Sequence, residues 1–142
     1  IRDVKQNPRI KIPIFGNGDV DSVEKAAAWR KEFEVDGIMI GRAAIGYPWI
    51  FREIKHFFET GERLEGPTIA ERVEVCKTHL TKSIEWKGDK LGIFEMRRHY
   101  SNYFKGIPNF KEQRMKLVSL SSEKEILEVL EDIKYNFSEL AV

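Results

Sequence analysis

The chain has 142 residues with 24 basic and 23 acidic side chains, so its formal net charge of +1 points to no class of partner. A single cysteine excludes a disulfide framework, and no apolar segment is long enough to cross a membrane. No signal peptide is recognisable either. We therefore expect a soluble protein of the cytoplasm that makes no membrane contact.

The first informative segment is an apolar run over residues 11–15, which ends in Gly16-Asn17-Gly18-Asp19. The run lacks the alternation of a half-exposed strand, which predicts a parallel strand buried on both faces. Gly18 can present backbone N–H groups without a Cβ, and Asn17 can donate through its amide. A carboxylate repels phosphate, so we expect Asp19 to act through its backbone or as a helix cap.

A helix is expected to follow, because Asp21 and Glu24 stand at the spacing of a capping box. A second apolar run over residues 37–40 predicts a second strand, parallel to the first through a right-handed crossover. The expected buried face of the connecting helix carries Val23, Ala26, Ala27, Arg30 and Phe33.

Gly41 and Arg42 come directly after the second run. Gly41 leaves the backbone accessible, and Arg42 offers a planar fork to phosphate oxygens. The next helix is expected to begin at Pro48 and to end at Thr60-Gly61. Each turn alone is an ordinary loop composition, but two strand-turn-helix units in succession are typical of the phosphate site at the end of a (β/α)8 barrel. The predicted phosphate ligands are Asn17, Gly18, Asp19, Gly41 and Arg42.

The second half of the chain is predicted to be all-helical. Thr68 and Glu71 form a capping box for a helix that runs to Gly88, which suits a left-handed cap. Further helices are expected over residues 90–104 and 110–118, and from Ser122 with Glu125 in capping-box register. We therefore expect a barrel remnant at residues 1–60, a linker at 61–67 and a small helical bundle at 68–142.

Basic side chains concentrate between residues 90 and 116. This segment has seven basic and two acidic side chains, for a local charge of +5. The segment from residue 119 onward has six acidic and two basic side chains, for a local charge of −4. A solvated helix face can carry the same charges. A basic face beside an acidic one is also typical of a nucleic-acid-binding surface, because phosphate contacts supply most sequence-independent affinity.

The segments Gly-Asn-Gly-Asp, Asp-Gly-Ile-Met-Ile-Gly-Arg-Ala-Ala and Pro-Trp-Ile-Phe together resemble the end of the barrel in tRNA-dihydrouridine synthases, with the bacterial NifR3/DusB-like branch closest. The resemblance continues through residues 95–99 and 103–108 into their RNA-facing helical domain. It implies an FMN phosphate held by the five residues named above. It also implies NADPH as the reductant of a uridine in tRNA. The RNA contacts that it implies are Arg97, Arg98, His99 and Lys105.

A complete barrel takes about 250 residues, so we expect most of it, including the family's proton-donating cysteine, to lie outside this chain. Cys76 shares an apolar helical stripe and is expected to be a buried structural thiol. We therefore predict no catalytic residue and no metal site here, in an inactive C-terminal portion that self-associates to cover open strand edges. The alternatives are a non-catalytic nucleic-acid-binding helical module and another flavin or sugar-phosphate barrel enzyme.

Overall fold

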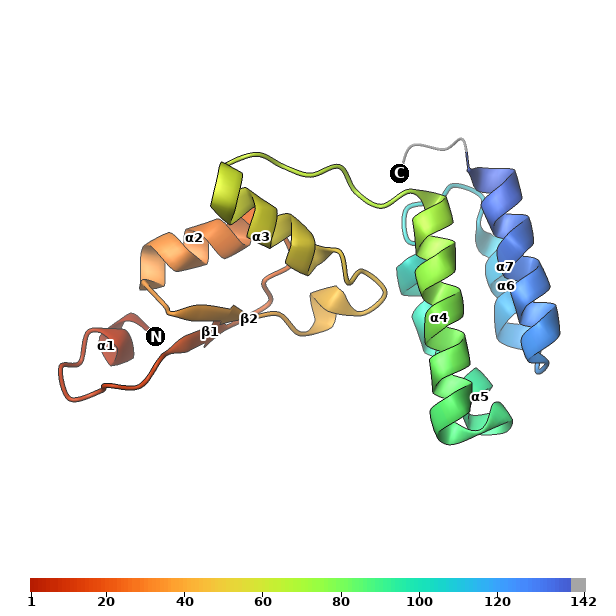
Figure 1. Ribbon diagram of the computed structural model, residues 1–142, viewed down its shortest axis with the longest axis horizontal. Coiled ribbons are helices and arrows are strands. Elements are labelled where there is room, and N and C mark those ends of the chain that lie inside the picture. The colour runs from red at the N-terminus through yellow and green to blue at the C-terminus, as the bar shows by residue number, and fades with distance from the viewer. Residues whose placement is uncertain (139–142) are drawn as a thin grey trace. The chain divides into compact units, whose positions relative to one another are not determined.

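The structure is a computed structural model that describes residues 1–138. The chain divides into two compact units, and the boundary between them along the sequence falls between Glu65 and Gly66. The first unit contains α1 (Arg2–Lys5), β1 (Phe15–Asn17), α2 (Val23–Phe33), β2 (Gly37–Met39), a 3-10 turn η1 (Arg42–Ala44) and α3 (Ile50–Thr60). The second unit contains α4 (Ile69–Lys87), α5 (Asp89–Tyr103), α6 (Lys111–Ser119) and α7 (Glu123–Phe137) (Figure 1).

The two strands of the first unit pair in parallel, with Phe15 opposite Gly37 and Asn17 opposite Met39. Helix α2 connects them, so the expected β-α-β order is present. Helices α2 and α3 pack on each other and lie on the same side of the strands (Figure 1). Their shared core consists of Val20, Ala26, Ile50 and Ile54, with half-buried side chains such as Trp29 and Ile38 packed around it.

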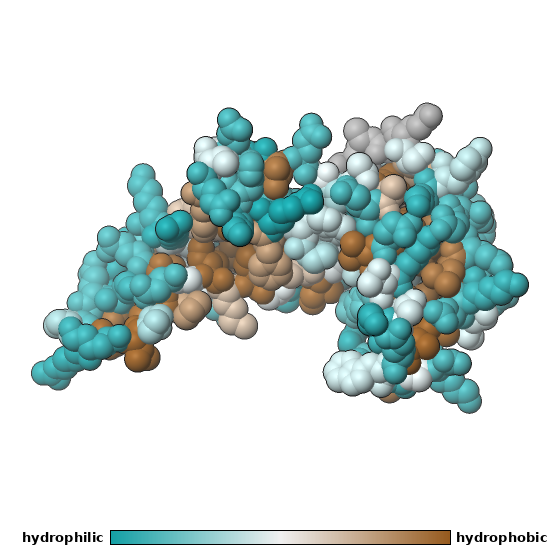
Figure 2. Space-filling model, in the orientation of Figure 1, coloured by the Kyte–Doolittle hydropathy of each residue, from teal (hydrophilic) through white to brown (hydrophobic). Residues whose placement is uncertain are grey.

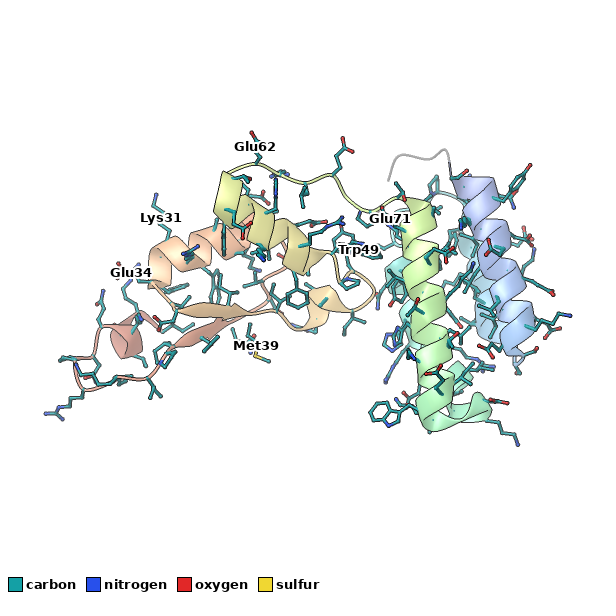
Figure 3. The ribbon with its side chains drawn as sticks, in the orientation of Figure 1. Lys31, Glu34, Met39, Trp49, Glu62 and Glu71 are labelled. Atoms are coloured by element: carbon teal, nitrogen blue, oxygen red, sulfur yellow. The ribbon has the colours of Figure 1, made fainter. Side chains whose placement is uncertain are left out.

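The other face of this sheet is open, and here the prediction of strands buried on both faces is wrong for the described residues. Phe15 and Met39 are 67% and 57% exposed, and Ile12 is 72% exposed. Met39 points away from α2 and α3 (Figure 3), and apolar side chains are visible along that side of the unit (Figure 2). The cause is that both helices cover one face, whereas burial on both faces needs a second layer.

The first strand also begins later than predicted, at Phe15 rather than at residue 11. The N–H of Ile14 donates to the Asp36 carboxylate at 2.7 Å, and its carbonyl accepts from the Asp36 N–H at 2.9 Å. Lys5 Nζ pairs with the same carboxylate at 2.6 Å. These bonds tie the segment before β1 to the turn before β2, so only three residues remain for the parallel ladder.

Two expected helix starts in the first unit differ from the structure. Ser22, not Asp21, caps α2, because its side chain accepts the Lys25 N–H at 3.2 Å. Asp21 instead lies 3.7 Å from Lys25 Nζ. Pro48 precedes the cap residue Trp49, so α3 begins after it. Arg30, which was predicted to be buried, is exposed, and its guanidinium lies 4.9 Å from the ring centroid of Phe58 on α3.

The helical unit follows its local signals more closely. The capping box of Thr68 and Glu71 is formed, and Cys76 is fully buried in the core, where burial raises the pKa of its thiol. Helix α4 packs against α5 and α7, and α6 packs against α5 and α7. The largest fully buried core side chains include Tyr100, Phe104, Leu80, Met96, Leu117, Ile126, Leu130 and Ile133.

Two predicted caps of the helical unit are wrong in detail. Gly88 has φ 77° but ψ 163°, so it turns the chain directly into α5 instead of forming a left-handed cap. Ser122 stands at the cap position of α7 without a side-chain capping bond, so no capping box forms with Glu125. Among residues 1–138, no helix combines the length and apolar character needed to span a bilayer.

Candidate functional site

The turns after β1 and β2 line one cavity of about 830 Å³. The carboxyl ends of neighbouring parallel strands lie at the same edge of a sheet, so these turns meet there. All five residues predicted to hold phosphate line this cavity: Asn17, Gly18, Asp19, Gly41 and Arg42. Four further residues complete the lining: Val20, Asp21, Lys25 and Ala43.

The absence of a side chain has a different structural effect at each of the two glycines of the cavity. A Cβ at Gly18 would lie 2.5 Å from Cη2 of Trp29, so the missing side chain leaves room for that indole. A Cβ at Gly41 would meet no atom within 4 Å, so nothing in the described chain occupies the space beside it. Gly18 therefore serves the packing of α2 against β1, and Gly41 keeps one wall of the cavity bare.

An ion pair between Asp19 and Arg42 joins the two turns. Asp19 has φ 47°, a left-handed conformation in which aspartate is enriched among non-glycine residues. Its side chain accepts from the Arg42 guanidinium, so the expectation that this side chain caps the helix is wrong. The side chains of Arg42 and Asp19 are 82% and 67% exposed, so the pair is weak and open to competition from an anion.

The charged side chains of the cavity balance. Lys25 and Arg42 are matched by Asp19 and Asp21, which lie against them as ion-pair partners. An anion entering the cavity therefore competes with a carboxylate for each of the two cations. Lys25 was not among the predicted ligands, although a lysine in the first turn of the helix that follows a glycine turn was a usable signal.

The four residues predicted to contact RNA are divided between surface and interior. Arg98 and Lys105 are exposed, whereas Arg97 and His99 are half-buried. Arg97 donates to the carbonyl oxygen of Leu120 at 3.2 Å, so it secures the connection between α6 and α7. The side chains of Arg98 and Lys105 are therefore better placed than that of Arg97 to reach a ligand.

His99 belongs to a small ring cluster between α4 and α5. Its ring centroid lies 4.9 Å from that of His79, and His79 Nδ1 is 3.0 Å from the hydroxyl of Tyr103. Desolvation lowers the pKa of both imidazoles, with the positive charge of Lys87 adding to the effect at His79. At His99, His79 and Arg98 lower the pKa further, against an opposing contribution from Glu95.

This cluster predicts that the stability of the helical unit falls in mild acid. Because the folded pKa of both histidines lies below the ordinary 6.5, the unfolded chain binds more protons near pH 6. The free energy of unfolding is therefore highest above about pH 6.5 and decreases as the pH falls toward 5. Urea unfolding followed by circular dichroism at several pH values measures this slope.

In the doubly substituted control, His79→Gln with His99→Gln, the free energy of unfolding should lose most of its dependence on pH between about 6.5 and 5. Hydrogen bonds from lysine side chains hold the pKa of Glu74 and Glu95 below 4.5, so these carboxylates stay ionised over the same range. An unchanged slope in the double variant would contradict the assignment to this cluster.

The family model for dihydrouridine synthase (Dus) matches residues 1–138. The chain belongs to the dihydrouridine synthase family. The Dus family has a TIM-barrel fold, and this Dus chain is mostly helical with a two-stranded parallel sheet.

Individual relatives are similar over most of this Dus chain. A protein of Synechocystis called a probable tRNA-dihydrouridine synthase 1 is 39% identical over 92% of the chain and 36% of its own length. The tRNA-dihydrouridine synthase B of Shewanella oneidensis is 39% identical over 99% and 42%, and that of Pseudomonas putida is 42% identical over 78% and 33%. The predicted DusB-like resemblance is thus confirmed, and the chain spans about a third to two fifths of these relatives.

Proposed function

We propose that this chain is the phosphate-holding and RNA-contacting part of an FMN-dependent tRNA-dihydrouridine synthase, which reduces uridine in tRNA with NADPH in the cytoplasm. The proposal rests on one observation above all. Five residues, chosen from the sequence at the ends of two strands, line a single cavity in a chain of the Dus family.

The donor groups of the cavity suit a phosphate monoester. The Arg42 guanidinium and the Lys25 ammonium supply positive charge, and the Asn17 amide supplies a neutral donor. At Gly41 the open space lets a ligand oxygen approach the backbone. FMN, when bound, supplies the hydride chemistry, and the role of these residues is to anchor its phosphate.

The one-sided sheet supports reading the first unit as the last two β/α units of a barrel. Helices α2 and α3 cover the face that would be outermost, and Phe15 and Met39 stand on the face that would look inward. Those exposed apolar side chains also support the proposal that the chain by itself self-associates. The catalytic acid of the enzyme is proposed to lie outside the chain.

The phosphate site can be tested with two ligands that differ by one group. FMN should shift the amide NMR signals of residues 17–19 and 41–43, and riboflavin, which lacks the phosphate, should not. Arg42→Ala should weaken FMN binding about tenfold or more, because a charge-assisted hydrogen bond is worth roughly 1.5–3 kcal/mol. Arg63→Ala is the matched control, since Arg63 is an exposed arginine of the same unit that pairs with Glu24 outside the cavity.

A second variant tests whether Asp19 competes with the ligand. Asp19→Asn tolerates the left-handed backbone and removes the carboxylate from Arg42, so FMN affinity should rise several-fold. Equal shifts by riboflavin and FMN, or the same affinity in Arg42→Ala and the wild type, would contradict the phosphate site.

A further inference from the structure

Trp86 is a large apolar side chain that the fold leaves in water. It lies in the last turn of α4 and is 83% exposed, whereas Trp49 is 9% exposed and Trp29 is half-buried in the first core. Since the hydrophobic core of the second unit does not include Trp86, its ring contributes little to packing.

Trp86 begins a chain of contacts that crosses from α4 to α5 through Lys87, Glu95 and Arg98. Lys87 Nζ lies 5.3 Å from the Trp86 ring centroid and also pairs with Glu95. Arg98 Nη2 lies 3.7 Å from the same Glu95 carboxylate, and Arg98 Nε lies 3.3 Å from His99 Nε2. Trp86 is therefore connected, through contacts within the hairpin of α4 and α5 (Figure 1), to two residues predicted to contact RNA.

The charges around Trp86 suit a nucleic-acid base and its phosphates. Its sequence neighbours are Glu85 and Lys87, Glu85 pairs with Lys82 at 2.7 Å, and Lys87 lies against the ring, so charged side chains flank the indole on its own helix. Aromatic faces beside cations are how proteins bind unpaired nucleotides, with the base stacked on the ring and the phosphates held by Lys or Arg.

We propose that Trp86 is the platform on which an unpaired base of the tRNA stacks, while Lys87 and Arg98 contact the adjoining phosphates. This inference rests on the proposed function, because it presumes that the helical unit binds tRNA. It adds a residue outside the segments that resemble the family's RNA-facing motifs, and it assigns that residue a base contact instead of a phosphate contact.

The test is binding of the full chain to tRNA as a function of salt. Trp86→Ala should weaken binding about tenfold, because stacking on one aromatic side chain is worth roughly that much. Trp86→Phe should retain most of the affinity. The slope of log affinity against log salt should be the same in Trp86→Ala as in the wild type, since stacking releases no counterion, whereas Arg98→Ala should reduce its magnitude by about one.

Two controls separate stacking from a general loss of structure or charge. Tyr135→Ala removes an equally exposed aromatic, 85% exposed on α7 in the acidic segment, and should leave binding unchanged. A perfectly paired RNA duplex should bind the wild type and Trp86→Ala equally, because it offers no unpaired base. Quenching of fluorescence on tRNA addition should also be smaller in Trp86→Phe than in the wild type.

The outcomes distinguish the stacking role of Trp86 from the proposed binding of tRNA by the chain. If the wild type binds tRNA with a steep salt dependence and Trp86→Ala binds equally well, the stacking role is overturned and the proposed function stands. If the wild type does not bind tRNA, the RNA-contacting function itself is overturned, and the stacking role with it.

Discussion

Replacing Gly92 by alanine should destabilise the helical unit by about 1–3 kcal/mol, the usual cost of overpacking a core. In most helices the same change is stabilising by up to about 1 kcal/mol, because alanine is the better helix former. Here a Cβ would lie 2.8 Å from the backbone Cα and N of Ile84, so α4 and α5 would have to move apart. The midpoint of urea unfolding, followed by circular dichroism, measures the loss.

The geometry around Gly92 explains why the alanine cannot be accommodated locally. The atoms that it would strike are backbone atoms of α4, and Ser83 Oγ already donates to the Gly92 carbonyl at 3.1 Å. Asn102→Ala, at an exposed position of the same helix, is the matched control and should be neutral or slightly stabilising. Equal or greater stability of Gly92→Ala would show that the two helices are not held in this close contact.

Replacing Arg72 by methionine should lower the free energy of unfolding by about 2–4 kcal/mol. Arg72 is 6% exposed, and its guanidinium donates to the carbonyl oxygens of Pro67 at 3.3 Å and Lys105 at 3.1 Å. Methionine fills much of the same volume but donates no hydrogen bond, so both carbonyls lose a charged donor. The same urea unfolding experiment measures the effect.

Two substitutions calibrate the role of Arg72. Arg72→Lys keeps the charge but not the planar fork, and it should lie between the wild type and Arg72→Met. Arg114→Met changes an exposed arginine on α6 and should have an effect within about 0.5 kcal/mol. Similar stabilities of Arg72→Met and Arg114→Met would mean that the buried guanidinium does not hold the end of α5 to the start of α4.

The features that could be predicted from the sequence depend on residues close together in the chain. The capping box of Thr68 and Glu71 is a bond between residues three apart, and the end of α3 at Gly61 depends on the freedom of one residue, with φ 78°. The stripe that buries Cys76 repeats with the period of one helix. The positions of the two glycine turns followed from the same local signals, and with them five of the residues that line the cavity.

Arg72 was open to the same reasoning and was missed. It stands three residues after Ile69 on the buried side of α4, where a charge is unexpected unless it is paired. The sequence showed the position, but its partner carbonyl at Lys105 lies 33 residues away. Only the packing of α4 against α5 brings them together.

The sequence by itself determined the approximate extents of the main helices, which two turns hold glycines, and which family the motifs resemble, because each depends on short-range geometry or on a short pattern. The tertiary structure alone decided that Asp19 would pair with Arg42, that Trp29 would fill the space beside Gly18, and that one face of the sheet would be open. It also placed Arg97 against Leu120 while leaving Arg98 in solvent, although both are arginines of one helix. These outcomes depend on which surfaces of distant segments meet, and the burial of apolar area that selects those surfaces has no local signature.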